Sequence, residues 1–114
     1  MKVLIAGFGS IGSRHLKNVF AIDSHCNVVI WHQRSKRTAV TDDRSPTVQR
    51  VYSLQEALDV RPDAALITGP ASTHIDTGLA LAKNDIHLFI EKPLSNRIDG
   101  VDNLLNECRA RGLV

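Results

Sequence analysis

The sequence predicts an α/β fold: a doubly wound parallel sheet of about five strands in the order 3-2-1-4-5. Short aliphatic runs alternate along the chain with segments whose apolar residues recur at helical spacing. The first run leads directly into a glycine-rich turn, Gly7–Gly12, and a helical pattern follows it. Two neighbouring parallel strands must be joined by a crossover connection, usually a helix, and such connections are almost always right-handed. The alternation of strands and helices therefore favours a parallel sheet.

The first half of the chain is expected to form three strands and two helices. The strands are Val3–Ala6, Asn27–Trp31 and the weaker Val48–Tyr52. One helix should run from about Ser10 to Phe20, with Leu16, Val19 and Phe20 facing inward. A capping box at Ser53–Glu56 should begin a second helix that ends near Val60, before Pro62. The polar stretch Gln33–Pro46 shows no periodicity and is interpreted as a loop.

The second half continues the alternation. Ala64–Ile67 and His87–Ile90 are the expected fourth and fifth strands. Between them a helix should cover about Thr73–Lys83, where Ile75, Leu79 and Ala82 share one face. A last helix is expected over about Arg97–Arg111, with Gly112 as its C-terminal cap. Its apolar stripe is Ile98, Val101, Leu104, Leu105 and Cys108.

The glycine-rich turn has the spacing G-x-G-x-x-G in a strand–turn–helix context, which is the dinucleotide-binding fingerprint. Gly7 permits the tight turn, Gly9 lets the backbone approach a pyrophosphate, and Gly12 lets the helix pack closely. The helix N-terminus offers N–H groups and a positive dipole end to phosphates. The expected cofactor contacts in this turn are Gly7, Phe8, Gly9, Ser10, Ile11 and Gly12.

Composition limits the other classes of function. The 114 residues suit one domain, and a net charge of +2 gives no case for nucleic-acid binding. No apolar run approaches the roughly 20 residues that span a bilayer, and no signal peptide is visible. Cys26 and Cys108 have no metal or redox spacing and are interpreted as reduced thiols of a cytoplasmic protein. The histidines form no metal spacing either, so no metal is expected.

Three motifs in order resemble the Gfo/Idh/MocA family (glucose–fructose oxidoreductase, inositol dehydrogenase and rhizopine catabolism). They are the N-terminal segment Lys2–Leu16, the turn Gly69–His74, and Phe89–Ser95, which contains Glu91-Lys92-Pro93. The resemblance implies the first domain, a Rossmann domain that binds NAD or NADP, of a two-domain dehydrogenase. The C-terminal substrate domain of that family is expected to be absent from residues 1–114, which alone should be inactive.

The resemblance also implies a reaction and its residues. The full enzyme would transfer hydride between a nicotinamide cofactor and a sugar-like or cyclitol-like substrate. Lys92 corresponds to the family lysine that points at the substrate hydroxyl, where an ammonium stabilises a developing oxyanion. The other residues expected around the cofactor are Thr68, Gly69, Pro70, His74, Glu91 and Pro93. Two alternatives stay open: a stand-alone nucleotide-binding module, and an inactive remnant.

Two of these positions have competing interpretations. His74 lies near the cofactor or substrate in the family, but Thr73 and Asp76 resemble a cap pair, so hydrogen bonding at the helix start is equally expected. Trp31 ends the second strand, where it could flank an adenine or plug the edge of the sheet.

The end of the second strand favours NADP over NAD. An NAD site places an Asp or Glu there to bind the ribose 2′-hydroxyl, whereas this chain has His32 followed by Arg34 and Ser35. Guanidinium and hydroxyl groups bind a 2′-phosphate that a carboxylate would repel. NADPH is therefore expected to bind more tightly than NADH. The alternative is that the segment is simply a basic surface loop, which NAD tolerates through backbone contacts.

The fifth strand predicts self-association of the isolated domain. His87–Ile90 is apolar, and no strand follows it within the sequence. It should therefore be an edge with unpaired N–H and C=O groups, which is a template for pairing with a second copy.

Overall fold

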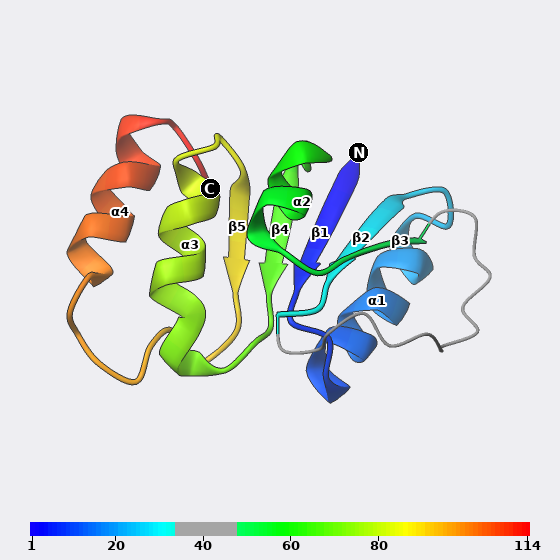
Figure 1. The fold of residues 1–114 in the computed structure, drawn as a ribbon, viewed down its shortest axis with the longest axis horizontal. Coiled ribbons are helices and arrows are strands. Elements are labelled where there is room, and N and C mark those ends of the chain that lie inside the picture. Colours follow the sequence, from blue (N-terminus) through cyan, green and yellow to red (C-terminus); the bar gives the residue numbers. More distant parts are fainter. Residues whose placement is uncertain (34–47) are drawn as a thin grey trace.

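A computed structural model describes residues 1–33 and 48–114 of the chain (Figure 1). The strands are β1 (Lys2–Ala6), β2 (Asn27–Trp31), β3 (Val48–Val51), β4 (Ala64–Ile67) and β5 (His87–Ile90). The helices are α1 (Ser10–Ile22), α2 (Leu54–Asp59), the 3₁₀ turn η1 (Ala71–Thr73), α3 (His74–Ala82) and α4 (Val101–Ala110). The expected loop lies, from residue 34 to 46, outside the described residues.

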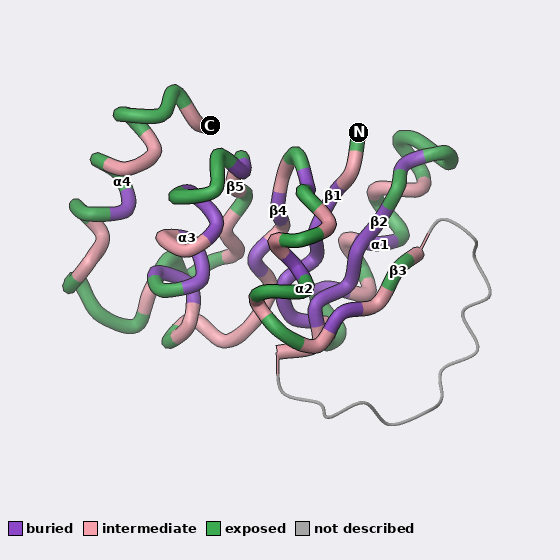
Figure 2. Tube along the Cα trace, turned by 45° about the horizontal axis from the view of Figure 1, so that its top comes forward, coloured by how far each residue is buried: buried purple, intermediate pink, exposed green. Residues whose placement is uncertain are grey.

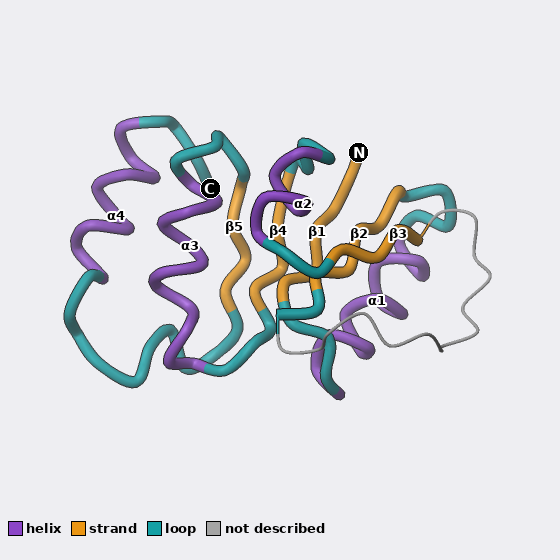
Figure 3. Tube along the Cα trace, in the orientation of Figure 1, coloured by secondary structure: helices purple, strands orange, loops and turns teal. Residues whose placement is uncertain are grey.

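The five strands form one parallel sheet in the order β3-β2-β1-β4-β5, as predicted. β1 is central: Leu4 pairs with Val29 of β2 on one side and with Ala65 of β4 on the other. All strands run in the same direction, so their carboxyl ends meet at one edge of the sheet, the lower edge in Figures 1 and 3. Ligands bind at this edge in doubly wound folds, because the chain diverges there to opposite faces of the sheet.

Helices cover both faces of the sheet. On one face α1 packs through Leu16 against Val3, Ile5, Val28 and Ile30. On the other, Ala57 of α2 and Leu81 of α3 pack against Leu4, Val29 and Ile67. α4 lies beside α3 and contacts it through Leu104 (Figure 1). Burial is greatest along β1, β2 and β4, and decreases toward β5 and α4 (Figure 2).

Two helix starts can be compared with their sequence signals. The Ser53 hydroxyl accepts a bond from the Glu56 N–H, which confirms the predicted cap of α2, while the Glu56 carboxylate accepts from the N–H of Tyr52. Thr73 makes no side-chain cap at α3; its hydroxyl donates to the carbonyl of Pro70, so the predicted cap pair with Asp76 is wrong. The preceding 3₁₀ turn already satisfies this end, because the Thr73 N–H bonds the same carbonyl.

The start of the last helix differs from the prediction. α4 begins at Val101, four residues later than expected, because Gly100 adopts a left-handed φ of 84° and acts as the N-cap. Ile98, assigned to the apolar stripe, is 88% exposed. The predicted C-terminal signal is confirmed: Gly112 has φ 66°, its N–H bonds Arg109 and the next N–H bonds Cys108, which is a Schellman motif.

The outer edge of β5 is partly occupied, which corrects the expectation that all of its groups are unpaired. The Leu88 N–H donates to the Val114 carbonyl (2.7 Å), and the Val114 N–H donates to the ring of His87. Phe89 nevertheless remains 53% exposed on the face that carries α1. Self-association through this edge stays a prediction. Within the described parts of the chain, none of the helices combines the length and the apolar character needed to cross a membrane.

Candidate functional site

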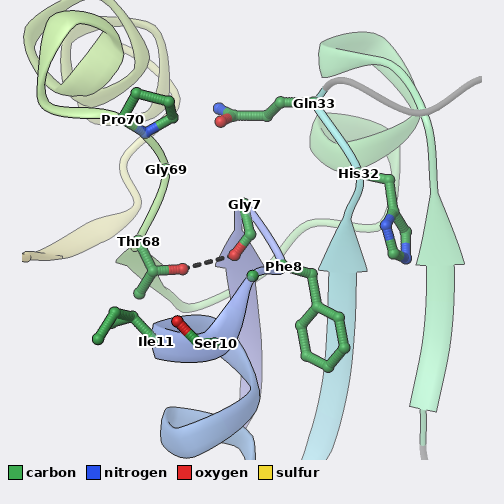
Figure 4. A pocket seen from close by; sticks show the side chains of 10 residues that line it. Gly7, Phe8, Ser10, Ile11, His32, Gln33, Thr68, Gly69 and Pro70 are labelled. Atoms are coloured by element: carbon green, nitrogen blue, oxygen red, sulfur yellow. Dashed lines mark hydrogen bonds between the residues drawn. The ribbon is translucent and has the colours of Figure 1, made fainter.

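A cavity of about 420 Å³ opens at the carboxyl edge of the sheet, where β1, β2 and β4 end (Figure 4). Its volume is within the range of small-molecule sites. The turn after β1 forms its floor, the residues after β2 form one wall, and those after β4 form the other. It is lined by Gly7, Phe8, Gly9, Ser10, Ile11, His32, Gln33, Thr68, Gly69 and Pro70. None of these residues is acidic.

The glycines of the turn have separate geometric roles. A Cβ built on Gly7 would lie 2.6 Å from the backbone nitrogen of Gly69, and Gly7 has a φ of 96°, so only glycine fits. A Cβ on Gly12 would lie 2.5 Å from the Gly7 carbonyl, where α1 packs close to the turn. A Cβ on Gly9 would meet nothing within 4 Å, so this backbone faces open space at the start of α1. The tight turn at Gly7 and the close packing at Gly12 agree with the spacing, while the approach of a pyrophosphate to Gly9 stays a prediction.

The hydroxyl of Thr68 ties the second wall to this turn by donating to the Gly7 carbonyl (Figure 4). Gln33, which sequence reasoning missed, reaches from the end of β2 toward the same wall. Its amide donates to Thr77 of α3 (3.2 Å), and its oxygen fills the space beside Gly69. The β2 and β4 walls are therefore joined by a side-chain contact as well as through the sheet.

His32 stands in a cluster that sequence reasoning also missed. Its ring stacks on Tyr52 (centroids 5.4 Å apart, 17° between planes) and meets the edge of Phe8 at 5.8 Å. Arg50 on β3 places its guanidinium carbon 5.7 Å from the centre of the Phe8 ring and donates from Nη1 to Nε2 of His32 (2.9 Å). Burial, and then the charge of Arg50, lower the pKa of His32. The strand order 3-2-1 was the signal that could have found Arg50, since it brings the end of β3 beside the end of β2.

His74 joins two turns at the site. It is 1% exposed; its Nε2 lies 2.8 Å from the Gly69 carbonyl and its Nδ1 lies 3.0 Å from the Pro93 carbonyl. Gly69 lines the cavity, and Pro93 follows Lys92 across a cis peptide bond. The ring therefore fixes the Lys92–Pro93 turn relative to the cavity wall, a role that neither sequence interpretation described.

Glu91 and Lys92 follow β5 at the same edge of the sheet. The Glu91 carboxylate accepts bonds from His15 of α1 (2.7 Å) and from the backbone N–H of Lys92 (3.1 Å), and Arg14 lies 3.9 Å away. The hydrogen bond from His15, followed by that from Lys92, lowers the pKa of Glu91. His15 also packs edge-on against Phe89. The side chain of Lys92 is exposed, at the end of the strand.

Replacing His15 with leucine is expected to raise the pKa of Glu91 toward its ordinary value, because the hydrogen bond that lowers it most is removed. A carboxyl group with a lowered folded-state pKa stabilises the fold above its ordinary pKa and loses that contribution as the pH falls through the folded-state value. Carboxyl ¹³C NMR titration measures the shift directly. Lys17→Gln, on the same helix, is the control; a Glu91 midpoint that does not move in His15→Leu would contradict the assignment.

The structure thus brings most of the predicted site residues to one edge of the sheet. Nine of them line the cavity, Gly12 lies beneath it, and His74 connects it to Glu91, Lys92 and Pro93, which lie outside its lining. Arg34 and Ser35 are outside the described residues. Trp31, which the sequence left either beside an adenine or at the edge of the sheet, is buried in the core with Leu4 and Val51, on the face that carries α2. It is not among the residues that line the cavity.

Residues 1–33 and 48–114 contain no group of three or more His, Cys, Asp or Glu side chains placed to hold a metal ion. Both cysteines are free thiols, Cys26 buried and Cys108 half-buried.

The chain is similar in sequence to two proteins that are named as dehydrogenases. It is 29% identical over 116 residues to myo-inositol 2-dehydrogenase of Thermotoga maritima and 26% identical over 117 residues to 4-carboxy-2-hydroxymuconate-6-semialdehyde dehydrogenase of Sphingobium sp.. Both alignments cover 100% of this chain but only 34% and 36% of the relatives, so the chain spans about a third of their length.

A solved structure agrees in fold. UDP-N-acetylglucosamine 3-dehydrogenase of Acidithiobacillus ferrooxidans superposes with a TM-score of 0.80 at 24% identity, over 100% of this chain and 36% of that one. The family model described as "Oxidoreductase family, NAD-binding Rossmann fold" matches residues 1–114. Because this match covers the whole sequence, the chain belongs to the Gfo/Idh/MocA family of oxidoreductases.

Proposed function

We propose that residues 1–114 form a single nucleotide-binding domain that holds NADP(H) in preference to NAD(H). The observation that carries this is the open backbone of Gly9 at the start of α1, within a cavity whose described lining residues include no acidic side chain. Phosphates can approach the N–H groups there without meeting a Cβ. The sequence has no Asp or Glu from Trp31 to Thr41, so the carboxylate that would repel a 2′-phosphate is missing directly after β2.

In the full enzyme the domain would serve hydride transfer between the cofactor and an alcohol. The nicotinamide supplies the hydride chemistry when it is bound. Lys92, at the end of β5, would place its ammonium against the substrate oxygen and stabilise the charge that develops as the hydroxyl proton leaves. His74 holds the following Pro93 to the cavity wall, and Glu91 accepts the backbone N–H of Lys92, so both would keep this lysine in place.

The proposed substrate class is a sugar-like or cyclitol-like alcohol. The support is the kinship with a protein named for myo-inositol oxidation and the fold shared with a UDP-sugar dehydrogenase. Catalysis needs the reacting groups held together. We therefore propose that the substrate pocket belongs to a further domain, corresponding to the part of the relatives that this chain does not span.

The cofactor proposal is tested by titrating the chain with NADPH and NADH in a calorimeter. NADPH is expected to bind more tightly, and Arg34→Ala should narrow the difference because it removes a cation beside the predicted 2′-phosphate site. Lys17→Gln, which removes a cation from the middle of α1, is the control and should leave the difference unchanged. Equal affinities, or tighter binding of NADH, would end the NADP assignment; binding of neither would end the nucleotide assignment.

A further inference from the structure

We infer that Arg50 on β3, acting together with His32, helps to discriminate the 2′-phosphate of the nucleotide. This inference rests on the proposed function and names, at the same site, a residue that neither the motif nor the end of β2 identifies. Arg50 pairs in register with Ile30 of β2, and Ile30 lies two residues before His32. The Arg50 side chain therefore lies near the carboxyl edge of the sheet. The contacts to His32 and Phe8 place its guanidinium beside two residues that line the cavity.

The hydrogen bond between Arg50 and His32 has a fixed direction. A guanidinium can only donate, so its bond to His32 requires Nε2 of the imidazole to act as an acceptor. In a neutral ring the proton is then on Nδ1, and the acceptor nitrogen is already engaged by Arg50. The pair can therefore offer only N–H donors to a ligand.

A donor-only pair discriminates between the two nucleotides. The ribose 2′-hydroxyl of NAD donates a hydrogen bond to a carboxylate, and neither His32 nor Arg50 can serve as that acceptor. A 2′-phosphate presents only acceptor oxygens and negative charge, which match a guanidinium and an imidazole N–H. The charge of Arg50 is permanent, whatever further contacts it makes.

Contacts among the side chains hold His32 and Arg50 in place before any ligand binds. His32 is stacked on Tyr52 and contacts the edge of Phe8, and the guanidinium lies over the same Phe8 ring. Phe8 is also part of the glycine-rich turn, so the charge has a fixed relation to the predicted phosphate site of α1. Preorganised donors lose little freedom on binding, which favours a specificity role over an incidental surface cation.

The test isolates the 2′-phosphate by using two fragments that differ only in that group, adenosine 2′,5′-bisphosphate and 5′-AMP. Calorimetry on the full chain should show the bisphosphate binding more tightly. In Arg50→Gln its affinity is expected to fall by roughly 10- to 100-fold, the loss typical of a charge-assisted hydrogen bond, while that of 5′-AMP changes less than about threefold. Arg50→Lys should recover only part of the loss, because the planar fork is missing.

Arg109→Gln removes the same charge from α4 and should leave both affinities unchanged. If Arg50→Gln does not fold, ¹⁵N NMR of wild type replaces it: the bisphosphate, and not 5′-AMP, should shift the His32 ring and Arg50 side-chain signals. Equal losses for both fragments, an unchanged ratio, or signals that respond equally would overturn the inference while nucleotide binding stands. Absence of binding by NADPH, NADH and both fragments would overturn the proposed function together with it.

Discussion

Gly9→Val is expected to abolish nucleotide binding while the chain stays folded. A side chain at this position would enter space that no protein atom occupies, so the fold tolerates it. The same space is where a pyrophosphate must approach the N–H groups that begin α1. The NADPH affinity should fall by at least about 100-fold, because both the close approach and its hydrogen bonds are lost.

Stability provides the internal control for this variant. Gly9 is the N-cap of α1 and makes no side-chain cap, so a β-branched residue there should lower the free energy of unfolding by only about 1 kcal/mol. Gly12→Val is the contrast, since its Cβ would collide with the Gly7 carbonyl and unfold the turn. Calorimetry and thermal unfolding measured on the same samples separate the two effects. A Gly9→Val chain that binds NADPH as tightly as wild type would remove the phosphate role from this turn.

His74→Leu is expected to lower the free energy of unfolding by roughly 2–3 kcal/mol. Leucine fills much of the same buried volume but cannot donate a hydrogen bond to either the Gly69 or the Pro93 carbonyl, so the polar partner that lies between these two groups is lost. The measurement is urea unfolding at neutral pH. The free energy of unfolding of His74→Gln, which retains a hydrogen-bond donor, should lie between those of His74→Leu and wild type.

His25→Leu is the matched control, because His25 is exposed and its ring bonds the neighbouring Ser24. It should change stability by less than about 0.5 kcal/mol. If His74→Leu behaved like this control, the histidine would contribute nothing to joining the two turns. A loss of stability with unchanged Lys92 and Pro93 NMR signals would place the whole effect at Gly69.

The backbone of this protein is largely predictable from local sequence. β2, β4 and β5 have the bounds that their apolar runs predict, and the strand order follows from alternation and handedness. The start of α4 was missed because an apolar period continues through Ile98, whereas a left-handed glycine delays the helix. Periodicity does not report backbone conformation at a single residue.

The site likewise contains residues that local sequence predicts and contacts that it does not. The turn residues and Thr68–Pro70 were predictable, since each follows a strand at the edge where parallel strands end. The strand order brings Arg50 near His32, but the contacts themselves, of Arg50 with His32 and of His15 with Glu91, were not predictable, because they join side chains 18 and 76 residues apart. Such pairs depend on rotamers and on the exact crossing of elements, neither of which a single sequence encodes locally.

The central position of β1 has a consequence for how the chain acquires its structure. β1 is synthesised first, yet one of its two partners, β4, begins at Ala64. One side of this hydrophobic strand therefore stays unpaired until more than half of residues 1–114 have been synthesised. Pairing β1 with β4 closes a long loop, and its closure costs entropy before any contact offsets it. Folding should accordingly be slow compared with local hairpin folds, and the interval before β4 appears is when the nascent chain is most prone to aggregate.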